Sequence, residues 1–278
     1  MIRLGKMNTL KVLKSVDFGL YIGEENNEIL LPIKYVPVGT NVGDEVDVFV
    51  YKDSEARPIA TTLIPYAQLD QFASLKVVSA TNHGAFMDLG IEKDLFVPFK
   101  EQQVRMEEGK NYVVRICYDH KTSRLIGVSK INTFFSKDVD ELNLGEEVSL
   151  LVYDQSELGY SVVINGKYRG LIYANDIFED ISVGDEKVGY IKEIRTDGKI
   201  DVTLRQIGAV AIDTGMNDVL SKFEQEGLTE LPYNDKTDPE IIKREFNMSK
   251  KTFKKAIGGL YKSGKINILE TGIALKSE

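Results

Sequence analysis

Short runs of alternating hydrophobic and polar residues recur along the chain as far as Gln206. In one run Val46, Val48 and Val50 alternate with other residues, and a run around Val114 has the same texture. Successive side chains of a β-strand point to opposite faces, so this period of two predicts half-buried strands. After Gln206 the hydrophobic spacing becomes helical, and we expect a different fold there.

The predicted strands belong to an internal repeat. Three glycines occupy the same place in its three copies: Gly19, Gly84 and Gly159. Each is followed 24 or 25 positions later by a second glycine in an acidic frame, then by a β-rich run, a turn and a last short strand. Five short strands in about 60 residues cannot bury two faces of an open sheet, so we expect each copy to close into a small barrel.

The second copy carries a recognisable family pattern. From HGAFMDL (83–89) to IGVSK (126–130) it resembles the S1-type RNA-binding domain, an oligonucleotide-binding barrel. The first copy departs at its end, where 60–62 reads Ala-Thr-Thr, and the third diverges in its second strand. The resemblance implies three tandem barrels of the OB-fold class.

The last part of the chain contains residues typical of the ends of helices. Each of three expected helices starts at a side chain suited to capping a helix N-terminus: Asp213 or Thr214, Asp238 and Ser249. Proline follows Asp238 at the first helical position, and the first helix should end at Gly227. Residues 265–276 alternate around a Thr-Gly pair and predict a hairpin. Together these elements predict a winged-helix module.

The expected fold is therefore mainly β, with three S1-like OB-fold barrels and a C-terminal α/β winged-helix domain. We place the domains at 1–63, 64–132, 133–212 and 213–278. This domain order is similar to that of the conserved virulence factor B family of bacterial RNA-binding regulators. The resemblance implies a regulator of gene expression that acts on RNA.

The resemblance to the S1 class implies where RNA would bind. In such barrels, rings on both sides of the repeat glycine stack on bases, and here these are Phe18, Tyr21, His83 and Phe86. The period of two agrees for Phe86, which should face outward if Ala85 and Met87 face the core. The alternative is that the rings pack against a neighbouring barrel.

The third copy lacks most of this platform. Leu158 and Ser161 stand at the ring positions, although Tyr173 is kept where the other copies have Pro32 and Pro98. A spacer role for this copy is as compatible with the sequence as a binding role.

Charged residues at matching positions would complete the binding face. The resemblance implies an acid and a base near the last turn, namely Asp119 with Arg124 and Asp53 with Arg57; the third copy has Arg195 and Lys199 instead. Lys11 and Lys76, seven residues before the first ring, are candidate phosphate contacts. The alternative is a solvated hairpin turn with an exposed ion pair.

Charge is unevenly distributed along this acidic chain, whose net charge is −8. Between 243 and 265 there are eight basic residues and one acid. Four of them share one side of the third expected helix, opposite Phe253, Ile257 and Leu260: Lys250, Lys251, Lys254 and Lys255. In winged-helix folds this helix enters a groove, so a nucleic-acid contact is expected, with duplex DNA and structured RNA both open.

Other function classes find little support. The chain has two histidines and one cysteine, Cys117, and none of them has metal-ligand spacing. No nucleotide-binding fingerprint occurs, so we expect no cofactor and no enzymatic activity, with a metal-dependent nuclease as a remote alternative. No apolar run approaches the ~20 residues of a membrane helix, and a single cysteine suits the cytoplasm.

The sequence thus predicts a cytoplasmic, non-enzymatic protein that holds single-stranded RNA on its barrels, with a further contact to duplex nucleic acid through the winged helix. A DNA-binding transcription regulator led by the winged helix is one alternative. The other is a protein-interaction scaffold, which the acidic total favours.

Overall fold

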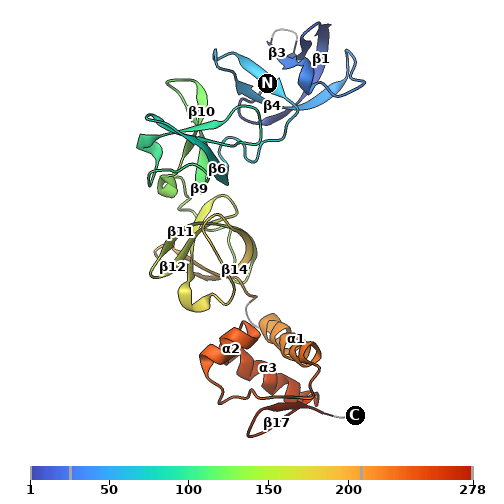
Figure 1. Cartoon of the computed structure of the whole chain (residues 1–278), viewed down its shortest axis with the longest axis vertical. Coiled ribbons are helices and arrows are strands. Elements are labelled where there is room, and N and C mark those ends of the chain that lie inside the picture. Colours follow the sequence, from blue (N-terminus) through green and yellow to red (C-terminus); the bar gives the residue numbers. More distant parts are fainter. Residues whose placement is uncertain (1, 25–26, 207–208, 277–278) are drawn as a thin grey trace. The chain divides into compact units, whose positions relative to one another are not determined.

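The computed structural model describes residues 2–24, 27–206 and 209–276. The chain forms two compact units, one of residues 1–135 with 183–185 and the other of 136–182 with 186–278. The first unit contains two closed five-stranded barrels, and the second contains a third barrel and a helical module (Figure 1). The mainly β fold class predicted from the sequence is confirmed, whereas the domain limits stay a prediction.

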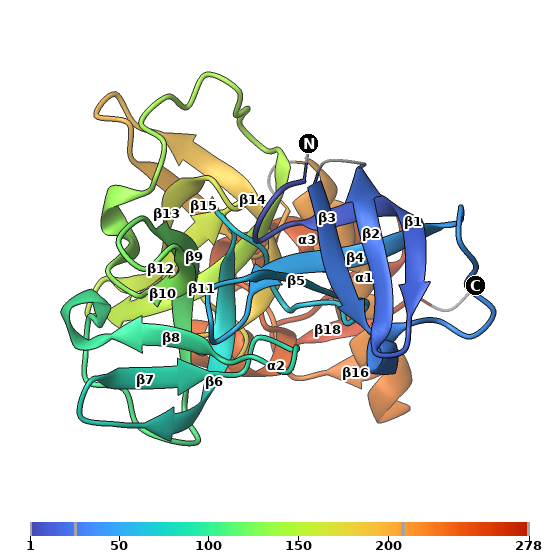
Figure 2. The ribbon, with the colours of Figure 1, turned by 90° about the horizontal axis from the view of Figure 1, so that it is seen from above.

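The two barrels of the first unit repeat one topology. The strands of the first barrel are β1 (Met7–Val16), β2 (Gly19–Glu24), β3 (Asn27–Pro32), β4 (Glu45–Lys52) and β5 (Pro58–Thr61). Those of the second are β6 (Phe72–Ala80), β7 (Gly84–Met87), β8 (Leu95–Pro98), β9 (Asn111–Asp119) and β10 (Arg124–Val128). Neighbours pair in the order β1-β2-β3-β5-β4 and its equivalent, and Figure 2 shows β1, β2 and β3 side by side. Each sheet closes, so its strands have paired neighbours on both sides.

The valines of β4 point into the first barrel, as their alternation predicts. Val48 and Val50 are buried in its core. The alternate residues Phe49 and Tyr51 do not face solvent, however. They are buried in the hydrophobic cluster of the second barrel. Their rings lie 6.1 Å apart and nearly parallel. From Val48 to Tyr51, strand β4 is therefore buried on both faces, which the alternation alone does not reveal.

The repeat glycines have a steric role. A Cβ atom on Gly19, Gly84 or Gly159 would lie 2.0–2.3 Å from a carbonyl oxygen of the next strand. The sequence suggests a bend or bulge at these glycines, but the irregularities of register lie in the preceding strand, for example between Val77 and Ser79 of β6. The glycines allow two backbones to approach closely instead.

The second unit begins with a barrel of the same strand order. Its strands are β11 (Glu147–Ser156), β12 (Gly159–Ile164), β13 (Tyr168–Tyr173), β14 (Glu186–Ile194) and β15 (Ile200–Thr203). The Asn165-Gly166 turn joins β12 to β13, and both residues have positive φ, as a tight hairpin requires.

The winged-helix module follows. Its elements are α1 (Ala209–Glu226), β16 (Glu230–Leu231), α2 (Pro239–Phe246), α3 (Lys250–Lys262), β17 (Ile266–Ile268) and β18 (Ile273–Leu275). The caps predicted for α2 and α3 are present, since Asp238 accepts a hydrogen bond from the Glu240 amide and Ser249 accepts one from the Thr252 amide.

Two details of this module differ from the sequence-based expectation. Helix α1 includes Ala209, so the start predicted at Asp213 or Thr214 is wrong. Two alanines, the strongest helix formers, lie before those positions, and no glycine or proline interrupts the helix there. Strand β16 pairs with β18 and was not expected, because two residues are too few to show a period.

We expect Gly84→Ala to destabilise the second barrel by roughly 3 kcal/mol or more, because its methyl group would lie 2.3 Å from the Val97 carbonyl oxygen. Gly109→Ala in the same barrel is the matched control. Gly109 has a φ of +82° but no neighbour within 4 Å of a Cβ atom, so its cost is limited to about 1 kcal/mol of backbone strain. Amide hydrogen exchange of β7 and β8 measures both losses, and equal losses would contradict the steric account.

Candidate nucleic-acid interface

Four residues predicted for the second barrel surround one cavity. His83 immediately precedes β7 and Phe86 lies within it, Asp119 is at the end of β9, and Arg124 is at the start of β10. All four line a cavity of about 540 Å³. The barrel topology thus brings together side chains from three strands that are separate in the sequence.

Aromatic rings form one side of this cavity. Ala85 and Met87 are buried in the barrel, so the intervening Phe86 faces outward, as predicted. Phe86 lies opposite Phe96 of β8, and the ring centres are 5.0 Å apart with a 42° tilt. Phe96 was missed in the sequence, although it alternates with the buried Leu95 in the same way.

The first barrel provides another side of the cavity. Tyr51 and Lys52 of β4 line it, and two long cationic side chains of the second barrel reach toward the backbone after β4. Lys93 Nζ donates a hydrogen bond to the Lys52 carbonyl (2.9 Å), and Arg124 Nη2 donates one to the Ser54 carbonyl (2.5 Å). The cavity belongs to two barrels, not one.

The Asp119–Arg124 pair does not behave as a solvated ion pair. The two residues lie opposite each other in the β9–β10 ladder, but Arg124 turns to the first barrel. Asp119 instead accepts hydrogen bonds from the Thr122 hydroxyl (2.7 Å) and the Lys121 amide (3.1 Å). In the first barrel, by contrast, Asp53 forms an ion pair with its predicted partner Arg57, at a distance of 2.8 Å.

Two like charges lie close together in the cavity. Burial lowers the pKa of Lys93, and the positive charge of Arg124 lowers it further. Asp94, which also lines the cavity, has its pKa raised by burial and by repulsion from Asp88. The site therefore presents cationic donors near rings, with the partly desolvated carboxyl of Asp94 beside them.

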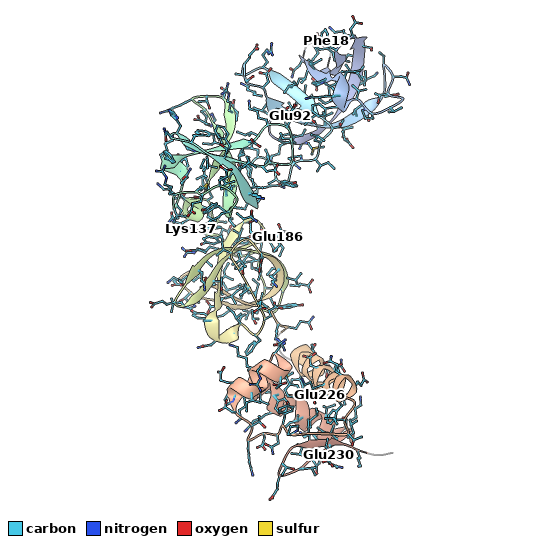
Figure 3. All side chains as sticks on the ribbon, viewed as in Figure 1. Phe18, Glu92, Lys137, Glu186, Glu226 and Glu230 are labelled. Carbon is cyan, nitrogen blue, oxygen red and sulfur yellow. The ribbon has the colours of Figure 1, made fainter. Side chains whose placement is uncertain are left out.

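An ion pair outside the cavity also joins the two barrels. Glu92 of the second barrel (Figure 3) accepts hydrogen bonds from Lys34 Nζ (2.5 Å) and from the Tyr35 hydroxyl (2.6 Å) of the first. These bonds, the one from Lys34 first, hold the pKa of Glu92 below its usual range. Both faces of this contact are exposed, so it contributes little to stability but reports on the joint between the barrels.

The predicted residues of the first barrel lie apart from the cavity. Phe18, labelled in Figure 3, is 56% exposed and meets Tyr21 edge to face, with ring centres 6.4 Å apart. Lys14 Nζ lies 4.4 Å from the centre of the Tyr21 ring. Lys11 of this barrel and Lys76 of the second barrel are both exposed, and neither lines the cavity.

The corresponding face of the third barrel is occupied by its own side chains. Arg195 forms an ion pair with the buried Asp201 (2.7 Å) and donates a hydrogen bond to the Tyr173 hydroxyl. Leu158 is exposed, whereas Ser161 is buried. The tyrosine retained here is thus engaged in an internal contact.

The basic residues of α3 lie as the helical period predicts. Phe253, Ile257 and Leu260 are buried in the module's core. The predicted contact residues lie away from that core, with one of them half-buried and three exposed: Lys250, Lys251, Lys254 and Lys255. An acid approaches one of them, since Asp235 lies 3.8 Å from the ammonium group of Lys254.

The described residues contain no group of three or more His, Cys, Asp or Glu side chains arranged to hold a metal ion. Over the same part of the chain, every helix is too short or too polar to cross a membrane.

Comparisons with protein families follow the domain order. A model of the S1 domain matches residues 4–63, and a model of the CvfB-like winged helix domain matches residues 217–275. The S1 match falls on the first barrel, whereas the second copy carries the resemblance most plainly in its residues. Both matches describe binding domains and not enzymes.

Relatives extend over most of the chain. It is 26% identical to the uncharacterized protein YitL of Bacillus subtilis over 273 residues, which is 95% of this chain and 91% of that protein. It is 27% identical over 241 residues to conserved virulence factor B of Staphylococcus aureus, covering 83% of this chain and 79% of the relative. The predicted resemblance to the conserved virulence factor B family is confirmed.

One solved structure is similar to this chain over nearly the whole length of both. It is a multidomain protein with nucleic acid binding domains from Streptococcus pneumoniae, 22% identical, with 98% of each chain covered and a TM-score of 0.44. The S1 and winged-helix domains together support nucleic-acid binding by this chain.

We expect the Glu92 carboxyl to titrate below the pKa of a free glutamate, and Lys34→Met to return it toward that value. Because the folded-state pKa is depressed, the contact contributes fully above the unfolded-state pKa and is lost as pH falls through the folded-state value. NMR titration of the Glu92 side-chain carboxyl measures its pKa in the parent protein and in Lys34→Met. An unchanged midpoint in Lys34→Met would show that the contact does not form in solution.

Proposed function

We propose that this protein binds single-stranded RNA, with the second barrel as its principal site, and that it regulates gene expression at the RNA level without catalysis. The observation that carries the proposal is the convergence of His83, Phe86, Asp119 and Arg124 on one cavity. The S1 and winged-helix matches support the nucleic-acid class of the ligand.

Stacking supplies the main attraction in this proposal. A base stacked on an aromatic side chain gains roughly 1–3 kcal/mol, and any base has a face that can stack. Phe86 and Phe96 offer such a surface, and Lys93 and Arg124 place donors beside it. An acidic chain gains little from long-range attraction to phosphates, so short-range contacts of this kind must carry the affinity.

The other domains contribute unequally. Phe18 and Tyr21 give the first barrel a second, more exposed stacking surface, with Lys11 as a phosphate contact. The third barrel serves as a spacer, because Arg195, which is paired with Asp201, donates a hydrogen bond to Tyr173 and no ring stands at the position of Phe86. The lysines of α3 add an electrostatic contact that salt weakens.

A second candidate function rests on α3 itself. Lys251 and Lys255 are exposed on the helix that enters a groove in winged-helix proteins. A DNA-binding regulator would use this helix for its principal contact and the barrels for other partners. The two functions differ in which domain carries the affinity.

We expect Phe86→Ala to weaken binding of a short single-stranded RNA by roughly 5- to 150-fold, the equivalent of one lost base stack. Fluorescence anisotropy with a labelled oligonucleotide measures the change. Leu158→Ala, at a ring position of the third barrel, is the control and should leave the affinity unchanged. If Phe86→Ala binds RNA as tightly as the parent protein, the barrel site is refuted.

We expect Lys251→Glu to weaken RNA binding by a similar factor for every sequence. The slope of log affinity against log salt concentration should fall by the equivalent of about one phosphate contact. Lys137→Glu, an equal charge change at an exposed lysine outside α3, should have a smaller effect. The measurement compares single-stranded RNA and duplex DNA at two salt concentrations. Tighter binding of the duplex, abolished by Lys251→Glu and indifferent to Phe86→Ala, would establish the DNA-binding alternative.

A further inference from the structure

The guanidinium of Arg124 is only partly satisfied. Its Nη2 donates to the Ser54 carbonyl, but its Nε is buried and has no hydrogen-bond acceptor among the described residues. Buried donors in folded proteins nearly always have a partner, and a charged one is especially costly to leave without one. The same side chain lines the cavity, so the guanidinium that carries this unsatisfied donor is part of the site where a ligand would bind.

The first barrel orients two of the cations that line the cavity, Lys93 and Arg124. The Lys52 and Ser54 carbonyls, at the end of β4 and in the turn after it, hold Lys93 and Arg124 respectively. Each cation keeps further N–H groups after making its bond to the first barrel. A ligand edge that meets them must therefore present acceptors and not donors.

The remaining lining limits the chemistry further. Phe86 and Phe96 offer a surface on which a flat ring can stack, and the volume of about 540 Å³ lies within the ~300–1,000 Å³ range of small-ligand sites. Asp94 and Asp119 line the same cavity and offer carboxylate acceptors. A ring with acceptors on one edge and donors on another matches this distribution.

Guanine is the nucleobase with these features. Its O6 and N7 are both acceptors, the edge that arginine recognises in pairs of hydrogen bonds, and its N2 amino group is a donor. Adenine has an amino group beside N7, and cytosine has one at the matching position, so both would place a donor against the cations. Uracil offers an oxygen but lacks N7.

We propose that the cavity between β4 and the face of the second barrel is a base-reading pocket that accepts one guanine of a single-stranded RNA, with its O6/N7 edge toward Arg124. This inference rests on the proposed function and adds a sequence preference to it. The preference depends on two barrels together, because the first barrel aims the side chain that reads the base.

The test uses the full chain and short adenine oligonucleotides that carry a single central guanine, uracil, cytosine or no substitution. We expect the guanine oligonucleotide to bind roughly tenfold tighter than the others, the value of one good pair of base contacts. Arg124→Gln should reduce this preference to less than about twofold, because it removes the cation that pairs with O6 and N7 of guanine.

A change in the ligand gives an independent test with the unaltered protein. Replacing the guanine by 7-deazaguanine removes the N7 acceptor and leaves the ring and O6 in place. We expect most of the preference to disappear. An unchanged preference for the modified oligonucleotide would overturn the assigned orientation of the base.

Glu92→Gln is the matched control for the joint between the barrels. It weakens a contact between them outside the cavity and should keep the guanine preference. If Glu92→Gln loses the preference as Arg124→Gln does, or if Arg124→Gln keeps it, the base-reading role is wrong. If no oligonucleotide binds and Phe86→Ala changes nothing, the proposed function itself has failed.

Discussion

The burial of β4 on both faces is the constraint on which the first unit depends. Its valines fill the first barrel, and Phe49 and Tyr51 on the other face enter the hydrophobic cluster of the second. Burying a large side chain contributes roughly 1.5–3 kcal/mol, so two rings outweigh the exposed contact at Glu92. Two copies of a repeat thereby become one compact unit.

The same strand determines the chemistry of the candidate site. The Lys52 carbonyl at the end of β4 and the Ser54 carbonyl in the turn after it hold Lys93 and Arg124 at the edge of the aromatic face. The adjoining first barrel turns a surface into a cavity, where reduced access of water strengthens each electrostatic contact. In the proposed function, these few oriented groups are what lets a chain with a net charge of −8 bind a polyanion.

The three barrels share a fold but not a binding face. Their glycines and inward residues are fixed by steric contacts, because a Cβ atom at Gly159 would strike a carbonyl oxygen just as one at Gly84 would. Outward residues are free of that constraint. In the third barrel Arg195 and Asp201 use this freedom to form an internal ion pair, while the second barrel leaves an arginine partly unsatisfied.

The sequence by itself determined the barrels, the winged helix, the caps at Asp238 and Ser249, and the outward direction of Phe86. These features follow from local alternation and local hydrogen bonds, which neighbouring residues specify; Phe96 could have been found by the same argument. Only the tertiary structure decided that the outer face of β4 is buried and that Arg124 turns to the first barrel. The carbonyl that accepts the hydrogen bond from Arg124 belongs to Ser54, 70 residues away in the chain, and no local pattern encodes a contact at that distance.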